Sequence, residues 1–172
     1  MAAAFWDKVD PRAIIVGHWR TLADDRTSRH SVNDVLLFYA APAVVAAALW
    51  VLKIPLSDNA LNIVTNALAI LAGLLFNLLV LLQSLSLPAA DHPLQKAGRR
   101  LAEEIYSNIA YSIIVSLVAL IPLIVAANFD VHDKGRLIAG SIATYIVIHF
   151  ALTMGMVLKR MHVMLEDEIA HK

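Results

Sequence analysis

Residues 59–87 contain no charged side chain, and this one segment limits most strictly what the chain can fold into. A helix needs roughly 20 apolar residues to cross about 30 Å of hydrocarbon, and this segment is longer than that. Small and polar residues recur along it at spacings of four and seven: Asn62, Asn66, Gly73, Asn77 and Ser84. At about 100° per residue, all five fall within roughly 60° of one helix face. The segment therefore predicts a membrane helix with one polar face, which we call the asparagine seam.

Three further apolar runs accompany it, at residues 35–52, 105–127 and 137–158. Charged residues make up 16% of the 172 residues, against about a quarter in soluble domains. A soluble helical bundle would carry a charged stripe on every helix, and these runs carry none. We therefore predict an all-α integral membrane protein with four transmembrane helices.

Proline and polar clusters divide the chain into a membrane domain at 35–158 and two flanking segments. The four spans are expected at residues 35–54, 59–87, 94–128 and 137–158. Short turns predict two antiparallel hairpins, with cytoplasmic extensions of the second and third helices. Residues 1–34 are expected to form a cytoplasmic or interfacial amphipathic segment, and residues 159–172 a charged cytoplasmic tail.

The amphipathic segment places Ile15 and Trp19 on one helix face. Two interpretations stand: a helix lying in the membrane interface, or a helix packed on the cytoplasmic ends of its own bundle. Lys and Arg number eleven in 1–34, 88–104 and the tail, but only three in the other two loops. The positive-inside rule therefore predicts an inner-membrane protein with both termini in the cytoplasm. The residues expected to face lipid or a cytoplasmic protein partner there are Trp19, Arg20, Arg26, Arg99, Arg100 and Glu103.

The asparagine seam allows two interpretations, because primary amides in hydrocarbon are costly without partners. It either joins helices or subunits through hydrogen bonds, or lines a conduit formed when several copies associate. In either case the seam is the expected site of self-association, and a homo-oligomer is predicted. Asn108, Ser112 and Ser116 form a second seam on the third span.

His149 is the one ionisable group deep inside a span, tyrosines apart. An intramembrane histidine is a candidate gate or proton carrier, since it titrates near physiological pH. A neutral imidazole hydrogen-bonded to Thr153 or Tyr145 would explain the same residue without such a role.

An enzymatic function is not expected. The chain has no cysteine, and its other histidines fit no metal-ligand spacing. No phosphate-binding loop, nucleophile motif or carboxylate pair is present, so no catalytic residue, metal or cofactor is predicted. The zero net charge gives no reason to expect nucleic-acid binding.

Three features of the chain read together with its two hairpins: the residues from His18 to Leu22, the Asp25-Arg26-Thr27 connector, and the residues from Ala72 to Leu79 in the second span. In this order of parts the chain resembles the small four-span inner-membrane proteins of bacterial anti-phage defence systems, of the phage-exclusion and Kiwa types. The resemblance implies a homo-oligomer that responds to a cytoplasmic signal of infection.

Two functional hypotheses follow. In the first, an oligomeric inner-membrane effector forms or gates an ion-permeable path through the bilayer. In the second, a membrane scaffold or sensor conducts nothing and docks a soluble cytoplasmic partner. An accessory subunit of a transporter is a third interpretation.

Overall fold

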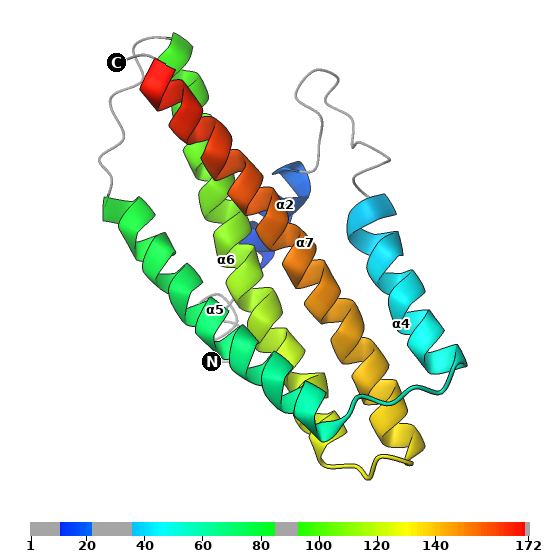
Figure 1. Ribbon diagram of the computed structural model, residues 1–172. Coiled ribbons are helices and arrows are strands. Elements are labelled where there is room, and N and C mark those ends of the chain that lie inside the picture. The colour runs from blue at the N-terminus through cyan, green and yellow to red at the C-terminus, as the bar shows by residue number, and fades with distance from the viewer. Residues whose placement is uncertain (1–10, 22–35, 85–92, 171–172) are drawn as a thin grey trace, which may run out of the picture.

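The computed structural model describes residues 11–21, 36–84 and 93–170, and these residues fold into helices without any strand (Figure 1). Helix α2 covers Arg12–Thr21, and a π-helical turn, η1, covers Leu36–Ala40. The turn leads directly into α4, Ala41–Val51. The long helices are α5 (Asp58–Ser84), α6 (Pro93–Ala127) and α7 (Lys134–Ala170). Predictions for residues 1–10, 22–35, 85–92 and 171–172 lie outside the described part of the chain.

Three helices are long and apolar enough to cross a membrane: Asp58–Ser84, Leu101–Ala127 and Lys134–His162. They contain 27, 27 and 29 residues, which correspond to roughly 40 Å of helix each. The hydrocarbon core is about 30 Å thick, so each helix can span it with tilt or overhang. The chain is thus compatible with a multi-pass membrane protein.

The first expected span is shorter. The apolar helix Leu36–Val51 combines the five residues of η1 with the 11 residues of α4. It is roughly 24 Å long at 1.5 Å per residue, which falls short of the hydrocarbon thickness. Of the four expected spans, the described residues therefore provide three of full length and one short apolar helix.

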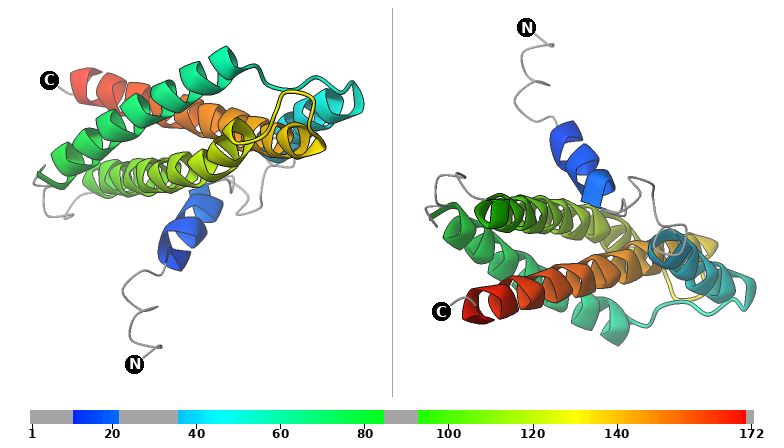
Figure 2. Two further views of the ribbon diagram at one scale, coloured as in Figure 1. Left: turned by 90° about the horizontal axis from the view of Figure 1, so that it is seen from below. Right: turned by 90° about the horizontal axis from the view of Figure 1, so that it is seen from above.

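The four apolar helices lie in the order α5, α6, α7, α4, with α5 and α4 at opposite sides (Figure 1). Helices α6 and α7 share the largest contact and form a packed hairpin. The first expected hairpin is not packed: α4 lies against α7 and α5 against α6, and these two helices have no close backbone contact with one another. Helix α2 packs on α6, on one side of this layer (Figure 2).

Side-chain size explains this order. Helix α5 presents Leu61, Leu68 and Leu75 to α6, all buried and seven residues apart. Such a narrow stripe fits one neighbouring helix. Helix α4 instead presents its alanine face, Ala43 and Ala46 among it, toward α7. The two helices thus carry different surfaces that suit different partners.

One helix boundary, the end of α7, differs from the sequence-based expectations. Helix α5 is described as far as Ser84, and residues 85–87 of the expected span lie outside the described part of the chain. Helix α6 is continuous from Pro93 through the expected cytoplasmic extension and past Pro122. Helix α7 continues to Ala170, so most of the expected tail is helical. Both overhanging ends, the start of α6 and the end of α7, lie together at one end of the molecule (Figure 1).

Helix α4 ends in a Schellman motif. The Ile54 N–H donates to the Leu49 carbonyl over 2.9 Å, and the Lys53 N–H donates to the Trp50 carbonyl over 3.2 Å. Lys53 occupies the left-handed position with φ of 55°, where glycine is usual. A residue with a Cβ pays about 1–2 kcal/mol in this conformation.

Arg136 joins three segments at the other end of the molecule, where the loops meet. Its side chain is almost completely buried. Nε donates to the Leu56 carbonyl at 2.9 Å, and Nη1 donates to the Phe129 carbonyl at 3.1 Å. Nη2 pairs with Asp58 Oδ1 at 2.6 Å. One guanidinium therefore fixes the α4–α5 linker, the start of α5 and the α6–α7 loop.

We predict that Arg136→Met lowers the free energy of unfolding by about 2–3 kcal/mol, because it leaves two carbonyls without donors. Arg136→Lys should lose about half as much, since an ammonium cannot reach all three acceptors as a fork. The measurement is unfolding by denaturing detergent, followed by circular dichroism. The exposed Lys159→Met on α7 is the control, and an unchanged midpoint in Arg136→Met would contradict this role.

Candidate functional site

The asparagine seam lies on the open side of α5. The side chains of Asn62, Asn66, Asn77 and Ser84 are exposed, as is Gly73. The seam stands roughly 150° around the helix from the leucine stripe that faces α6. Ser84 Oγ donates to the Leu81 carbonyl at 2.7 Å, whereas the three amides have no hydrogen-bond partner in the described part of the chain. The seam thus points away from the helix on which α5 packs.

The second seam lies in the interior. Asn108, Ser112 and Ser116 are buried where α6 meets its neighbours. Ser112 Oγ donates to the Asn108 carbonyl at 2.8 Å, and Ser116 Oγ donates to the Ile113 carbonyl at 2.7 Å. Their hydroxyls are satisfied within their own helix. In one copy of the chain, the two predicted seams therefore have opposite environments.

His149 is buried and uses both ring nitrogens. Nδ1 lies 2.9 Å from the Phe38 carbonyl, which can only accept, so Nδ1 carries the proton. Nε2 then accepts from the Tyr111 hydroxyl at 2.9 Å. The expected partners act differently: Thr153 Oγ1 donates to the backbone carbonyl of His149. The Tyr145 ring stacks parallel to the imidazole at a centroid distance of 6.4 Å.

The Phe38 carbonyl accepts this proton because a proline follows it. In a regular helix the N–H four residues later would bond to this carbonyl, but Pro42 has none. Pro42 is buried at the start of α4, directly after η1. Pro42 therefore exposes a carbonyl, and His149 on α7 binds it.

Helix α2 docks next to this histidine through a second one. His18 is fully buried, and its ring stacks on Tyr111 at 3.8 Å with an interplanar angle of 5°. Its Nδ1 lies 2.8 Å from Asn108 Oδ1, which also receives the Thr21 hydroxyl at 2.9 Å. Gly17 permits this approach, because a Cβ there would lie 2.3 Å from Ser107 Oγ. The polar start of the second seam is thus covered by α2.

This docking leaves two polar atoms unsatisfied. Nε2 of His18 and Nδ2 of Asn108 are buried without a partner in the described chain. Burial is the main cause that lowers the pKa of His18 from 6.5 to about 4. His149 and Arg160 lower this pKa further, while the bond to Asn108 raises it. The imidazole is therefore neutral at pH 7, and its protonation opposes docking.

Two further contacts hold α2. Arg160 on α7 pairs with Glu104 on α6 at 2.6 Å and donates to the Thr21 carbonyl at 2.5 Å. A cation at a helix C-terminus is favourable for the exposed carbonyls. Trp19 stacks on Tyr39 of η1 with ring centroids 5.4 Å apart. The short helix is thereby joined to α6, α7 and η1.

The other cytoplasmic candidates are only partly placed. Arg99 and Glu103 form an exposed ion pair along α6 at 3.1 Å. Arg26 and the side chains of Arg20 and Arg100 lie outside the described part. The residues that the sequence analysis missed are His18, Glu104, Tyr111, Arg136 and Arg160. His18 and Tyr111 do have a sequence signal, since each lies on the apolar face of its helix.

The described residues contain no group of three or more His, Asp or Glu side chains that could hold a metal ion. No protein-family model matches the chain, and the searches of curated proteins and of solved structures found no similar protein.

We predict that acid releases α2. The docked helix holds His18 neutral, so the undocked state binds more protons below pH 6.5. Docking should be complete above pH 6.5 and weaken progressively as the pH falls toward 4, by on the order of 3 kcal/mol in all. The fluorescence of Trp19 in a Trp6→Phe/Trp50→Phe background reports this release. His18→Gln removes the titrating ring, and a titration that persists in this variant would contradict the assignment.

Proposed function

We propose that this protein is a non-enzymatic, self-associating membrane protein whose α5 helices meet along the asparagine seam and form or gate an ion-permeable path. The proposed topology has four spans, with both termini and the overhanging ends of α6 and α7 in the cytoplasm of a bacterial cell. The excess of Lys and Arg on that side supports this orientation.

The observation that carries the proposal is the outward position of Asn66 and Asn77. Both lie within the apolar part of a spanning helix, and both are exposed in a single copy of the chain. A primary amide facing lipid tails costs several kcal/mol unless it finds a partner. A second copy presents the same amides, so side-by-side α5 helices satisfy one another or enclose water between them.

The rest of the chain leaves the seam accessible for this purpose. Among the described residues, α5 packs along α6, and its only other helix contact is the ion pair of Asp58 with Arg136 at its start, so most of its surface is free to meet another copy. Gly73 has open space where a Cβ would lie, which lets a neighbouring helix approach closely. The second seam, by contrast, is already filled by its own side chains and by α2. A path formed by several copies is therefore proposed along α5.

The test is ion flux through liposomes that contain the purified protein, compared with the Asn66→Leu/Asn77→Leu variant. We expect the leucine variant to lose most of its flux, by tenfold or more, because apolar side chains dewet a narrow path. Asn66→Ser/Asn77→Ser keeps polar groups at both positions and should retain flux. Ile70→Leu changes an exposed apolar residue of the same helix and is the matched control.

The oligomer mass separates the remaining outcomes. If the leucine variant has the wild-type mass but no flux, the amides serve permeation. If it falls apart into monomers, the seam serves assembly alone. Equal flux in both proteins would contradict the proposed path.

A membrane scaffold is the second candidate, and the docked α2 favours it. Three elements hold this short helix against the middle of α6. The exposed Arg99–Glu103 pair lies nearer the proposed cytoplasmic end, on the overhang of α6. In this function a soluble partner binds there, and Arg99→Ala/Glu103→Ala removes the binding without changing flux or oligomer mass.

The resemblance to anti-phage membrane proteins supplies the proposed setting. Phages should then form fewer plaques on bacteria that produce the protein than on bacteria that produce Asn66→Leu/Asn77→Leu. Equal plaque numbers across a panel of phages would argue against a role in defence.

A further inference from the structure

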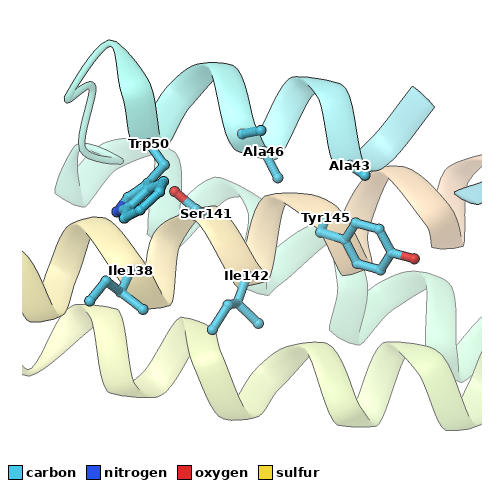
Figure 3. Close-up of a pocket in the computed structure, with 8 residues that line it drawn as sticks. Ala43, Ala46, Trp50, Ile138, Ser141, Ile142 and Tyr145 are labelled. Carbon is cyan, nitrogen blue, oxygen red and sulfur yellow. The ribbon is translucent and has the colours of Figure 1, made fainter. Parts of the chain in front are cut away.

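An apolar groove runs between α4 and α7, on the opposite side of the molecule from α5. It has a volume of about 490 Å³. Its lining residues are Ala43, Ala46, Ala47, Trp50, Ile138, Ser141, Ile142 and Tyr145. Figure 3 shows the alanines of α4 facing Ser141 of α7 across the groove, with Trp50 near one end and Tyr145 near the other. From Trp50 to Ala43 the groove extends for roughly 10 Å along the helix.

The alanines create this groove. Small residues on a membrane helix usually bring two backbones into contact. Here the indole ring of Trp50 lies between the helices at one end, and the space over Ala43 and Ala46 remains open (Figure 3). Because the lining is almost entirely apolar, a groove of this kind inside a bilayer suits a hydrocarbon chain.

A second hollow, of about 680 Å³, continues from the end at Trp50. It shares Trp50 and Ile138 with the groove, and it adds the polar side chains of Lys53, His132, Asp133 and Lys134. Neither lysine is paired with an acid in the described part of the chain. Asp133 is engaged by the Asp130 N–H at 3.3 Å. The mouth of the apolar groove therefore carries a positive excess.

The position of Lys53 is a separate observation. It holds the left-handed position of the Schellman motif, where glycine or asparagine would be less strained. The conformation turns the chain away at the end of α4 and places this lysine in the lining of the polar hollow. Together with Lys134 at the first position of α7, it brackets the mouth from both helices.

We propose that the groove and its mouth are a binding site for one anionic glycerophospholipid. One acyl chain lies along the alanines between α4 and α7, and the phosphate group lies between Lys53 and Lys134. Trp50 is at the depth of the membrane interface, where its indole ring suits the junction of chain and headgroup. The bound lipid fills the space that short α4 leaves beside α7. The proposal requires a bilayer around the helices, but it needs neither the proposed ion path nor an oligomer.

The test uses the full chain in nanodiscs of equimolar phosphatidylglycerol and phosphatidylethanolamine. Native mass spectrometry then counts the lipids that remain bound after release. We expect one phosphatidylglycerol to be retained in preference to phosphatidylethanolamine, by about 25-fold if each lysine contributes the usual fivefold attraction to an anionic headgroup. Lys53→Asn/Lys134→Gln should bring this ratio close to one, because asparagine keeps the left-handed backbone and removes the charge.

Two further variants test the groove itself. Ala46→Phe fills it and should abolish retention of both lipids. Val44→Phe adds the same bulk to an exposed position of α4 outside the groove and should retain the wild-type count. Lys159→Gln, an exposed lysine on α7 that does not line the mouth, should keep the full preference.

Three results would overturn the proposal: equal retention of the two lipids by the wild type, a preference that survives the loss of both lysines, or unchanged retention in Ala46→Phe. The lysine variants change only exposed side chains, so they decide the question even if Ala46→Phe does not fold. Asn66→Leu/Asn77→Leu should bind lipid as the wild type does, which separates this site from the proposed ion path.

Discussion

The interior of a bilayer offers no hydrogen-bond partners, and the arrangement of the helices follows from this constraint. The buried hydroxyls of α6 and α7 donate to carbonyls three or four residues earlier in their own helices. His149 and Asn108 cannot be satisfied in this way, so each draws in a group from another element. The α6–α7 hairpin is consequently the centre on which α4, η1 and α2 are fixed. The asparagines of α5 are the exception, since their partners must come from outside the described chain.

One missing donor starts a chain of contacts across the molecule. Pro42 leaves the Phe38 carbonyl without its helical partner, and His149 binds it. His149 accepts from Tyr111, and the Tyr111 ring stacks on His18. Helix α2, η1, α6 and α7 therefore meet at two imidazoles and one phenol. A change in the position of α2 would first affect the ring cluster, whose histidine also binds the turn before α4. This cluster is therefore in a position to couple α2 to α4.

Charge-free segments and their periodicity were enough to predict an all-helical chain with membrane-spanning helices, since such a pattern depends on local sequence alone. The outward seam of α5 was likewise visible as a polar stripe, although its direction depends on which helix α5 packs against. The order of the helices was not predictable from a short linker. Helices α4 and α5 are consecutive, yet the alanine surface of α4 packs against α7 and the leucine surface of α5 packs against α6. The bonds of Arg136 and Arg160 join residues 78 and 139 positions apart, and no sequence spacing reports such contacts.

The loop end and the middle of the molecule are held in different ways. At the loop end, Arg136 is buried and fixes three segments through two carbonyls and a carboxylate. Against the middle of α6 (Figure 1), α2 is held by a histidine with an unsatisfied nitrogen and by the partly buried pair of Arg160 and Glu104. Loss of α2 would therefore loosen the middle of the α6–α7 hairpin while the loop end stays fixed. Helix α5 packs along α6, so a movement of α6 there acts on α5 and its asparagine seam, although Asp58 keeps the start of α5 paired with Arg136 at the loop end. This links the docked helix to the surface proposed for self-association.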